Sequence, residues 1–185
     1  MKRFGLAGWS GSGKTTLLAR LIPALTACGV TVSTLKHAHH AFDIDTPGKD
    51  SHTHRVAGAA EVMVASRHRW ALIRELRDEP EPDLDALVAR MAPVDLLLVE
   101  GFKFHPHPKL EVWRAATGKP PLHPEDPWIV AIAGDRPEPA PGHAPTDLPV
   151  FDLDDIEAIA DFVLAACGLQ PAGPDRSLAP EAPER

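Results

Sequence analysis

Several features are scarce in this chain of 185 residues, and each scarcity excludes a class of protein. The only two cysteines, Cys28 and Cys167, lie far apart and outside any C-x-x-C pattern. We therefore expect free thiols in a reducing compartment, the cytoplasm, rather than a disulfide or a zinc pair. No apolar run is long enough to span a membrane. A formal net charge of −7 argues against a broad contact with a phosphate backbone, so we expect no nucleic-acid partner.

Tyrosine is absent, and the four tryptophans show no pattern of an aromatic binding platform. We expect Trp70, Trp113 and Trp128 to be packing residues, whereas Trp9 lies inside the motif described next. Neither H-E-x-x-H nor a Cys/His finger spacing occurs, so ten histidines predict surface or phosphate-contacting groups rather than a transition-metal site. Seven of them form three clusters in the sequence: His37, His39 and His40; His52 and His54; His105 and His107.

The sequence does contain an unbroken G-x-x-x-x-G-K-[ST] motif over residues 8–15, directly after an apolar run at residues 4–7. This motif is typical of a phosphate-binding loop, in which backbone N–H groups and the N-terminus of the next helix surround phosphate oxygens. Lys14 would reach the terminal phosphates and Thr15 a magnesium ion. The alternative is a glycine-rich turn that only caps a helix. The strand expected before the motif and the helix expected after it favour the phosphate site.

Apolar runs alternate with helical stripes, which indicates a mostly parallel sheet with helices on its faces. We expect strands at residues 4–7, 30–35, 61–65, 70–76, 95–100, 109–113 and 128–133, and helices at 15–27, 51–57, 84–91 and 154–167. Pro23 should kink or restart the first helix, and Asp154 with Glu157 has the form of a capping box for the last. The predicted fold is α/β, a P-loop NTPase-type three-layer sandwich. One domain would cover residues 1–169, and a disordered tail residues 170–185.

Charged residues are expected near the phosphate loop at two further places. Glu100 ends the apolar strand at 95–100, where an acid at the same sheet edge can hold the magnesium shell or orient water. An ordinary solvated carboxylate is the alternative. Asp50 lies in the loop region after the second strand and is a weaker metal candidate, and Lys36 or Lys49 could neutralise phosphate charge.

Beyond the phosphate loop, several blocks together resemble the molybdopterin-guanine dinucleotide biosynthesis adaptor family, MobB. The blocks are GWSGSGKTT at 8–16, KHAHH at 36–40, DTPGKDS at 45–51, RVAGA at 55–59, SRHRWAL at 66–72 and LVEGFK at 98–103. The resemblance covers residues 1–169 and implies a homodimer that binds GTP and Mg²⁺ and hydrolyses GTP weakly. It further implies partners among the molybdenum-cofactor nucleotidyltransferase and insertase proteins. By matching position, the implied phosphate and magnesium contacts are Gly11, Ser12, Gly13, Lys14, Thr15 and Thr16, with Glu100 as the strand-end acid and Asp50 as a weaker metal candidate.

The sequence departs from common GTPases in one respect, because it has no N-K-x-D motif that would recognise guanine. Residues 133–135 are our candidate for the base contact. No arginine finger is identifiable, so hydrolysis should be slow. A small-molecule kinase is the alternative function, since this fold suits phosphoryl transfer equally well. A third possibility is a binding module whose nucleotide site is inert.

Overall fold

The computed structural model describes residues 1–38, 42–103, 105–136 and 146–171. The chain divides into two compact units. The first, here called the sheet unit, comprises Met1–His37 and Ala92–Arg185. The second, here called the hairpin unit, comprises Ala38–Met91. A single domain over residues 1–169 stays a prediction, and most of the proposed tail lies outside the described residues.

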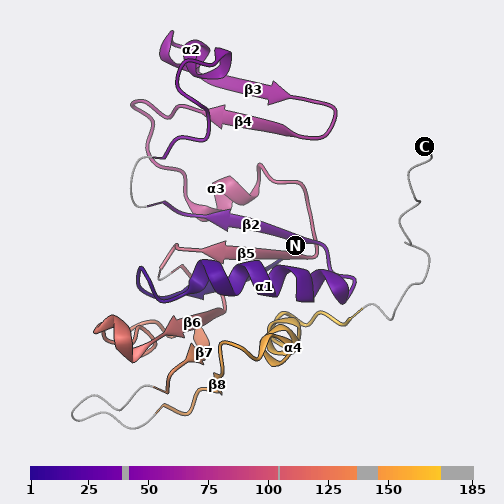
Figure 1. Cartoon of the computed structure of the whole chain (residues 1–185), viewed down its shortest axis with the longest axis vertical. Helices are drawn as coiled ribbons and strands as arrows, with labels where there is room; N and C mark the ends of the chain where they lie inside the picture. The colour runs from indigo at the N-terminus through magenta and orange to yellow at the C-terminus, as the bar shows by residue number, and fades with distance from the viewer. Residues whose placement is uncertain (39–41, 104, 137–145, 172–185) are drawn as a thin grey trace. The chain divides into compact units, whose positions relative to one another are not determined.

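The sheet unit is built on six strands that all pair in parallel. They are β1 (Lys2–Ala7), β2 (Val32–Lys36), β5 (Leu96–Glu100), β6 (Lys109–Trp113), β7 (Ile129–Gly134) and β8 (Val150–Phe151). Their order across the sheet is β2-β5-β1-β6-β7-β8, so β1 lies between β5 and β6. Figure 1 shows β2, β5, β6, β7 and β8 in this order. The carboxyl ends of parallel strands share one edge, which brings the residues after β1, β2, β5 and β6 together.

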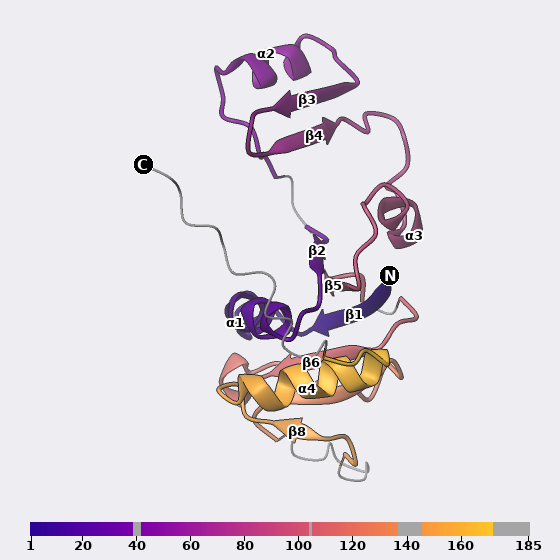
Figure 2. The ribbon, with the colours of Figure 1, turned by 90° about the vertical axis from the view of Figure 1, so that its right-hand side faces the viewer.

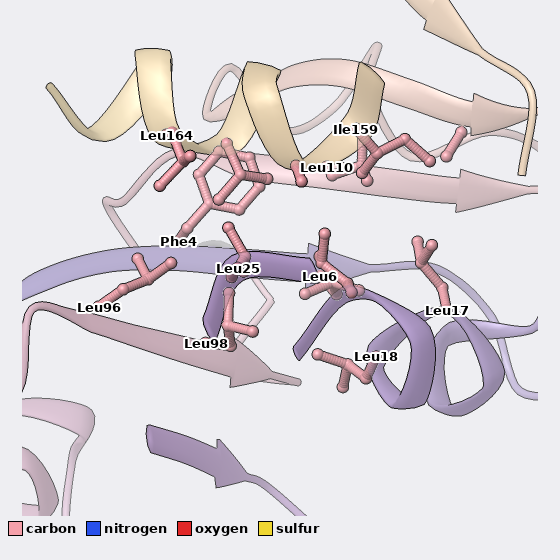
Figure 3. Packing of buried hydrophobic residues seen from close by; sticks show 14 of the residues in the cluster. Phe4, Leu6, Leu17, Leu18, Leu25, Leu96, Leu98, Leu110, Ile159 and Leu164 are labelled. Carbon is pink, nitrogen blue, oxygen red and sulfur yellow. The ribbon is translucent and has the colours of Figure 1, made fainter. Parts of the chain in front are cut away.

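Helices α1 (Lys14–Ala27) and α4 (Ile156–Cys167) pack on one face of this sheet (Figure 2). The apolar side chains of the strands point at the helices on alternate positions, as the period of two requires. Figure 3 shows this core, in which Phe4, Leu6, Leu98 and Leu110 meet residues of both helices. The predicted α/β, P-loop NTPase-type fold with a parallel central sheet is confirmed.

The opposite face of β6 carries buried charges instead of apolar side chains. Lys109 is fully buried, and its Nζ lies 3.1 Å from Oδ2 of Asp126 and donates to the carbonyl of His105 at 2.7 Å. Glu111 is also fully buried and accepts from the backbone N–H groups of Leu122 at 2.6 Å and His123 at 3.0 Å. These bonds fasten the segment that follows β6 to the sheet.

The hairpin unit contains a separate two-stranded antiparallel sheet. Its elements are α2 (Asp50–Val56), β3 (Glu61–Ala65), β4 (Trp70–Arg74) and α3 (Leu84–Val88). Arg55 on α2 pairs with Asp43 at 2.6 Å, Asp45 at 2.9 Å and Glu75 at 2.8 Å. One guanidinium therefore joins the segment before α2, the helix itself and the segment after β4.

Several sequence predictions need correction in detail. Helix α1 is continuous through Pro23, so it does not restart there, and the alternative, a kink, stays a prediction. The capping residue of α4 is Asp155, whose side chain accepts from the N–H of Ala158, rather than Asp154. Strand β8 was not predicted, because two residues carry no periodicity. Trp70 and Trp128 are exposed and are not core residues. Among the described residues, no helix combines the length and the apolar character that crossing a bilayer requires.

Candidate nucleotide-phosphate site

The predicted phosphate loop connects β1 directly to α1. Gly8 has a φ of 139°, and a Cβ atom there would lie 2.4 Å from the carbonyl oxygen of Val112, so only glycine fits. Gly13, at the N-cap, has a φ of 105°. The N–H of Leu17 bonds to the Gly13 carbonyl at 2.9 Å. The N–H groups of residues 14–16 therefore precede the helical ladder, where they can bind an anion.

Lys14 lies over the loop that precedes it. Its Nζ donates to the carbonyl oxygens of Gly8 at 2.8 Å and Trp9 at 2.9 Å. Burial lowers the pKa of Lys14, the charge of Glu100 opposes that shift, and the charges of Lys103 and Lys36 add to it. Among the described residues, no carboxylate is in contact with the Lys14 ammonium. Phosphate oxygens would be better acceptors for it than these two carbonyls, because both groups of the bond would then be charged.

Glu100 lies at the carboxyl end of β5, in register with Leu6 on β1 and Lys36 on β2. Its side chain is only 13% exposed, and its Oε1 lies 3.6 Å from Nζ of Lys36. The structure therefore brings Glu100, Lys14 and Lys36 to one edge of the sheet, as the parallel topology predicts. The hydroxyl-bearing residues Thr15 and Thr16 lie in the first turn of α1 and are exposed.

Trp9 is held in place on the β6 side of the loop. Its Nε1–H donates to the carbonyl of Pro120 at 2.7 Å, and its ring packs against a small apolar cluster that includes Leu122. Two lysines lie near the ring: Nζ of Lys103 is 4.4 Å from the ring centroid, and Nζ of Lys119 is 5.9 Å from it. Sequence reasoning singled out Trp9 but gave Lys103 no role.

Arg114 is a second residue that sequence reasoning missed. It follows β6, and its Nε and Nη2 lie 3.9 Å from the position that a Cβ would take on Gly13. Arg114 and Asp135 both line a pocket of about 570 Å³ at the carboxyl ends of β7 and β8. The strand order was the missing signal: once β6 is known to neighbour β1, the residue after β6 must lie beside the loop.

The remaining predicted residues have different outcomes, and the backbone N–H of His37 bonds to the carbonyl of Glu100 at 2.8 Å. Asp50 begins α2 in the hairpin unit, so its role at the metal stays a prediction. His37 packs against Phe102, with ring centroids 4.8 Å apart. His39 and His40 lie outside the described residues. Among those that are described, no three His, Cys, Asp or Glu side chains form a group that could hold a metal ion.

Comparison with known proteins agrees with this geometry. A family model described as "Molybdopterin guanine dinucleotide synthesis protein B" (MobB) matches residues 4–135. The molybdopterin-guanine dinucleotide biosynthesis adapter protein of Escherichia coli (strain K12) is 46% identical over 161 residues, which cover 85% of this chain and 89% of the relative. The protein of the same name from Haemophilus influenzae is 41% identical over 162 residues, covering 86% of this chain and 85% of the relative.

Solved structures share the fold. Bacillus subtilis MobB superposes with a TM-score of 0.68 at 26% identity, over 90% of this chain and 98% of that one. A crystal structure of a molybdopterin-guanine biosynthesis protein B gives a TM-score of 0.67 at 30% identity, over 90% and 99%. The parallel sheet and the loop after β1 thus define an α/β protein of the P-loop NTPase type. Within that class, the chain belongs to the MobB family, which confirms the resemblance inferred from its motifs.

Proposed function

We propose that this chain is a GTP-binding adaptor with weak intrinsic GTPase activity, and that it assists the biosynthesis of molybdopterin guanine dinucleotide. The observation that carries the proposal is the meeting of the phosphate loop, Lys14 and Glu100 at one sheet edge. The role in the pathway rests on the relatives, which are named adapter proteins of this biosynthesis.

The residues at this edge fit a magnesium ion beside phosphates. Magnesium prefers oxygen ligands, and it is usually bound through one or two protein groups together with phosphates and water. The Thr15 hydroxyl and the Glu100 carboxylate are such groups, with Glu100 acting through water or directly. A bound magnesium ion would neutralise charge on the β- and γ-phosphates.

The residues of the chain would bind the nucleotide and orient the attacking water, and none of them would form a covalent bond to phosphate. Lys14 can exchange its two carbonyl acceptors for phosphate oxygens, and the N–H groups of residues 11–16 can hold the phosphate chain in line for attack by water. Glu100 can order that water or the metal shell. Such an arrangement favours slow hydrolysis and a stable bound nucleotide, which suits an adaptor.

The nucleoside would lie toward β7 and β8. The pocket lined by Arg114, Gly134 and Asp135 is at the carboxyl end of these strands, where ligands of open α/β sheets bind. This supports residues 133–135 as the base contact. One carboxylate oxygen of Asp135 already accepts from the N–H of Ala115 at 2.8 Å, which leaves the other oxygen for a donor on the base.

The partners that we propose are the molybdenum-cofactor nucleotidyltransferase and insertase proteins, in the cytoplasm. A pull-down with the purified chain from a cytosolic extract should retrieve such a protein when GTP is present. Retention of none of them, in repeated experiments with folded bait, would contradict the adaptor role.

The nucleotide assignment is tested by mixing the chain with magnesium and either GTP or ATP, and following phosphate release with and without small-molecule acceptors. We expect slow release from GTP that acceptors do not change. Rapid transfer of the γ-phosphate to a metabolite, at roughly 1–100 per second as in kinases, would support the kinase alternative instead.

We further propose that the chain is a homodimer and that the hairpin unit supplies part of the interface. Met63, Trp70 and Leu72 share one face of the β3–β4 hairpin, because Met63 is directly opposite Leu72 and Ala65 opposite Trp70. These three side chains are 62%, 68% and 44% exposed. A lone two-stranded sheet is marginally stable, so a second copy covering this apolar hairpin face would stabilise it.

The dimer proposal predicts that Trp70→Glu produces a monomer in sedimentation experiments. Trp128→Glu is the matched control, because Trp128 is also an exposed tryptophan but lies in the sheet unit. It should leave the dimer intact. A Trp70→Glu variant that sediments as the parent chain does would remove the hairpin face from the interface.

A further inference from the structure

Lys103 lies at the phosphate loop, although it belongs to none of the residues expected to bind phosphate. Its Nζ is 4.4 Å from the centroid of the Trp9 ring, which is a cation–π contact. In the part of the chain that the structure describes, no carboxylate pairs with this ammonium group. Besides burial, its charge is one of those that lower the pKa of Lys14. Lys103 therefore places an unpaired positive charge near the lysine of the phosphate loop.

The backbone before Lys103 is held in an unusual conformation. Gly101 has a φ of 94° and Phe102 a φ of 48°, so two consecutive residues lie in the left-handed region. A Cβ on Gly101 would lie 2.7 Å from Cβ of His37, and the Phe102 ring packs on the His37 ring. Left-handed backbone at a non-glycine residue is costly and concentrates at functional sites. This backbone lies directly after β5, between Glu100 and Lys103.

We propose that Lys103 binds the terminal phosphate of a nucleoside triphosphate, and that Trp9 holds its ammonium group beside the loop until that phosphate is present. The proposal rests on the proposed function, because it requires a nucleotide at the phosphate loop. The lysine side chain is a flexible stem with a compact charge and three donors, so it can leave the ring for phosphate oxygens. A diphosphate lacks the group that Lys103 would bind. Lys103 thereby distinguishes the two nucleotide states.

Trp9 suits the holding role because its ring is fixed independently of Lys103. The indole N–H bonds to Pro120, and the ring packs on the cluster around Leu122. A cation–π contact at a partly solvated site is weak, whereas a charge-assisted bond to phosphate is strong. The exchange is therefore favourable when a triphosphate binds.

Lys119 provides a matched control within the same loop environment. Its Nζ also lies near the Trp9 ring, but 5.9 Å from the centroid. Lys119 follows β6 rather than β5, and its charge is not among those that shift the pKa of Lys14. Removing the Lys119 charge therefore tests whether the loss of any nearby positive charge weakens nucleotide binding, without removing the proposed bond from Lys103 to the terminal phosphate.

The first experiment measures dissociation constants for GDP and for a non-hydrolysable GTP analogue, with magnesium, by titration calorimetry. In Lys103→Met we expect affinity for the triphosphate analogue to fall about tenfold, as the loss of one charge-assisted bond implies, while GDP affinity stays unchanged. Lys119→Met should bind both as the parent chain does. Circular dichroism and thermal melting establish that each variant is folded.

The second experiment follows tryptophan fluorescence, which responds when the ammonium leaves the indole ring. The triphosphate analogue should change the emission of the parent chain and of Lys119→Met, and GDP should change it less. The difference between the two nucleotides should disappear in Trp9→Phe and in Lys103→Met. An identical response to both nucleotides in the parent chain would overturn the holding role of Trp9.

The outcomes separate this inference from the proposed function. If the parent chain binds neither nucleotide, the proposed function fails and this inference fails with it. If the parent chain binds the triphosphate analogue but Lys103→Met binds it equally well, only the inference on Lys103 is wrong. Equal weakening for both nucleotides would also overturn it, since Lys103 would then act as a general positive charge.

Discussion

Two lysines of the sheet unit show how the same type of side chain serves different purposes. Lys14 begins α1 at the edge of the sheet, and Lys109 lies on β6 within its buried face. Burial lowers the pKa of both lysines. Lys109 has a carboxylate partner, since its Nζ lies 3.1 Å from Asp126. Lys14 donates only to two backbone carbonyls of its own loop.

The difference in partners indicates a difference in role. A buried lysine that is fully paired within the protein has its charge neutralised and holds two segments together. A lysine that donates only to carbonyls keeps its positive charge available to a ligand. The two carboxylates differ in another way, because Glu111 accepts two backbone N–H groups, whereas Glu100 lies 3.6 Å from the exposed ammonium of Lys36. Lysine and glutamate thus have structural roles at some positions of the sheet unit and proposed binding roles at others.

The largest effect should come from breaking the buried pair. Lys109→Met leaves the Asp126 carboxylate buried without its cation, which should lower the free energy of unfolding by about 3–5 kcal/mol. Urea unfolding followed by circular dichroism measures this. The double variant Lys109→Met, Asp126→Leu should regain most of the loss, because no uncompensated charge remains. A loss below about 1 kcal/mol in the single variant would mean that the pair has no structural role.

Lys14→Ala should have the opposite profile. We expect the free energy of unfolding to change by no more than about 0.5 kcal/mol, because Lys14 donates only to two carbonyls of the loop beside it. Saturating GTP and magnesium should stabilise the parent chain by about 2.7 kcal/mol at a hundredfold excess over the dissociation constant. That stabilisation, measured as a shift in melting temperature, should be lost in the variant. An equal shift in both proteins would exclude Lys14 from the site.

The sequence predicted the parts of this comparison that depend on local patterns. Gly8, Gly13 and Lys14 follow the fixed spacing of a phosphate loop, and Glu100 ends a continuous apolar strand. The loop and Glu100 could therefore be placed at the same sheet edge. Lys109 and Glu111 could not be interpreted in the same way. They alternate with the apolar Leu110 and Val112, which suggests a solvated strand face, yet both are fully buried. Their partners lie on a segment of irregular structure, which no periodicity reveals.

Strand order limited the site prediction in a similar manner. Lys103, Arg114 and Pro120 approach the loop only because β5 and β6 flank β1. Parallel strands that are distant in sequence carry no local signal of which are neighbours. The exposure of Trp70 was also missed, because a hydrophobic residue in a strand is normally buried within its own chain.

A smaller effect is expected from His107, which lies beside Lys109 on the same face. Burial lowers the pKa of His107 to about 4, and the charges of Lys109, His105 and Arg3 add to this while Asp126 opposes it. The unfolded chain therefore binds a proton near pH 6.5, which the folded chain resists. Stability should fall as the pH decreases from 7 to 5, by about 2 kcal/mol from this group. His107→Gln should show a shallower decline in urea unfolding at the two pH values, and an unchanged slope would contradict the assignment.

The smallest effect is expected from Glu100→Gln, which tests the contrast between Glu100 and Glu111. Glu100→Gln keeps the size of the side chain and removes the charge that would order the water shell of a magnesium ion. We expect the variant to bind GTP still, to depend less on magnesium, and to hydrolyse GTP about tenfold more slowly, as for residues that support a metal through water. Phosphate release at a series of magnesium concentrations measures both effects. Lys36→Gln is the control for the ion pair, because it removes the partner of Glu100 but leaves the carboxylate. If Glu100→Gln hydrolyses GTP as the parent chain does, Glu100 has a structural role only, as Glu111 does, and the contrast between the two carboxylates no longer holds.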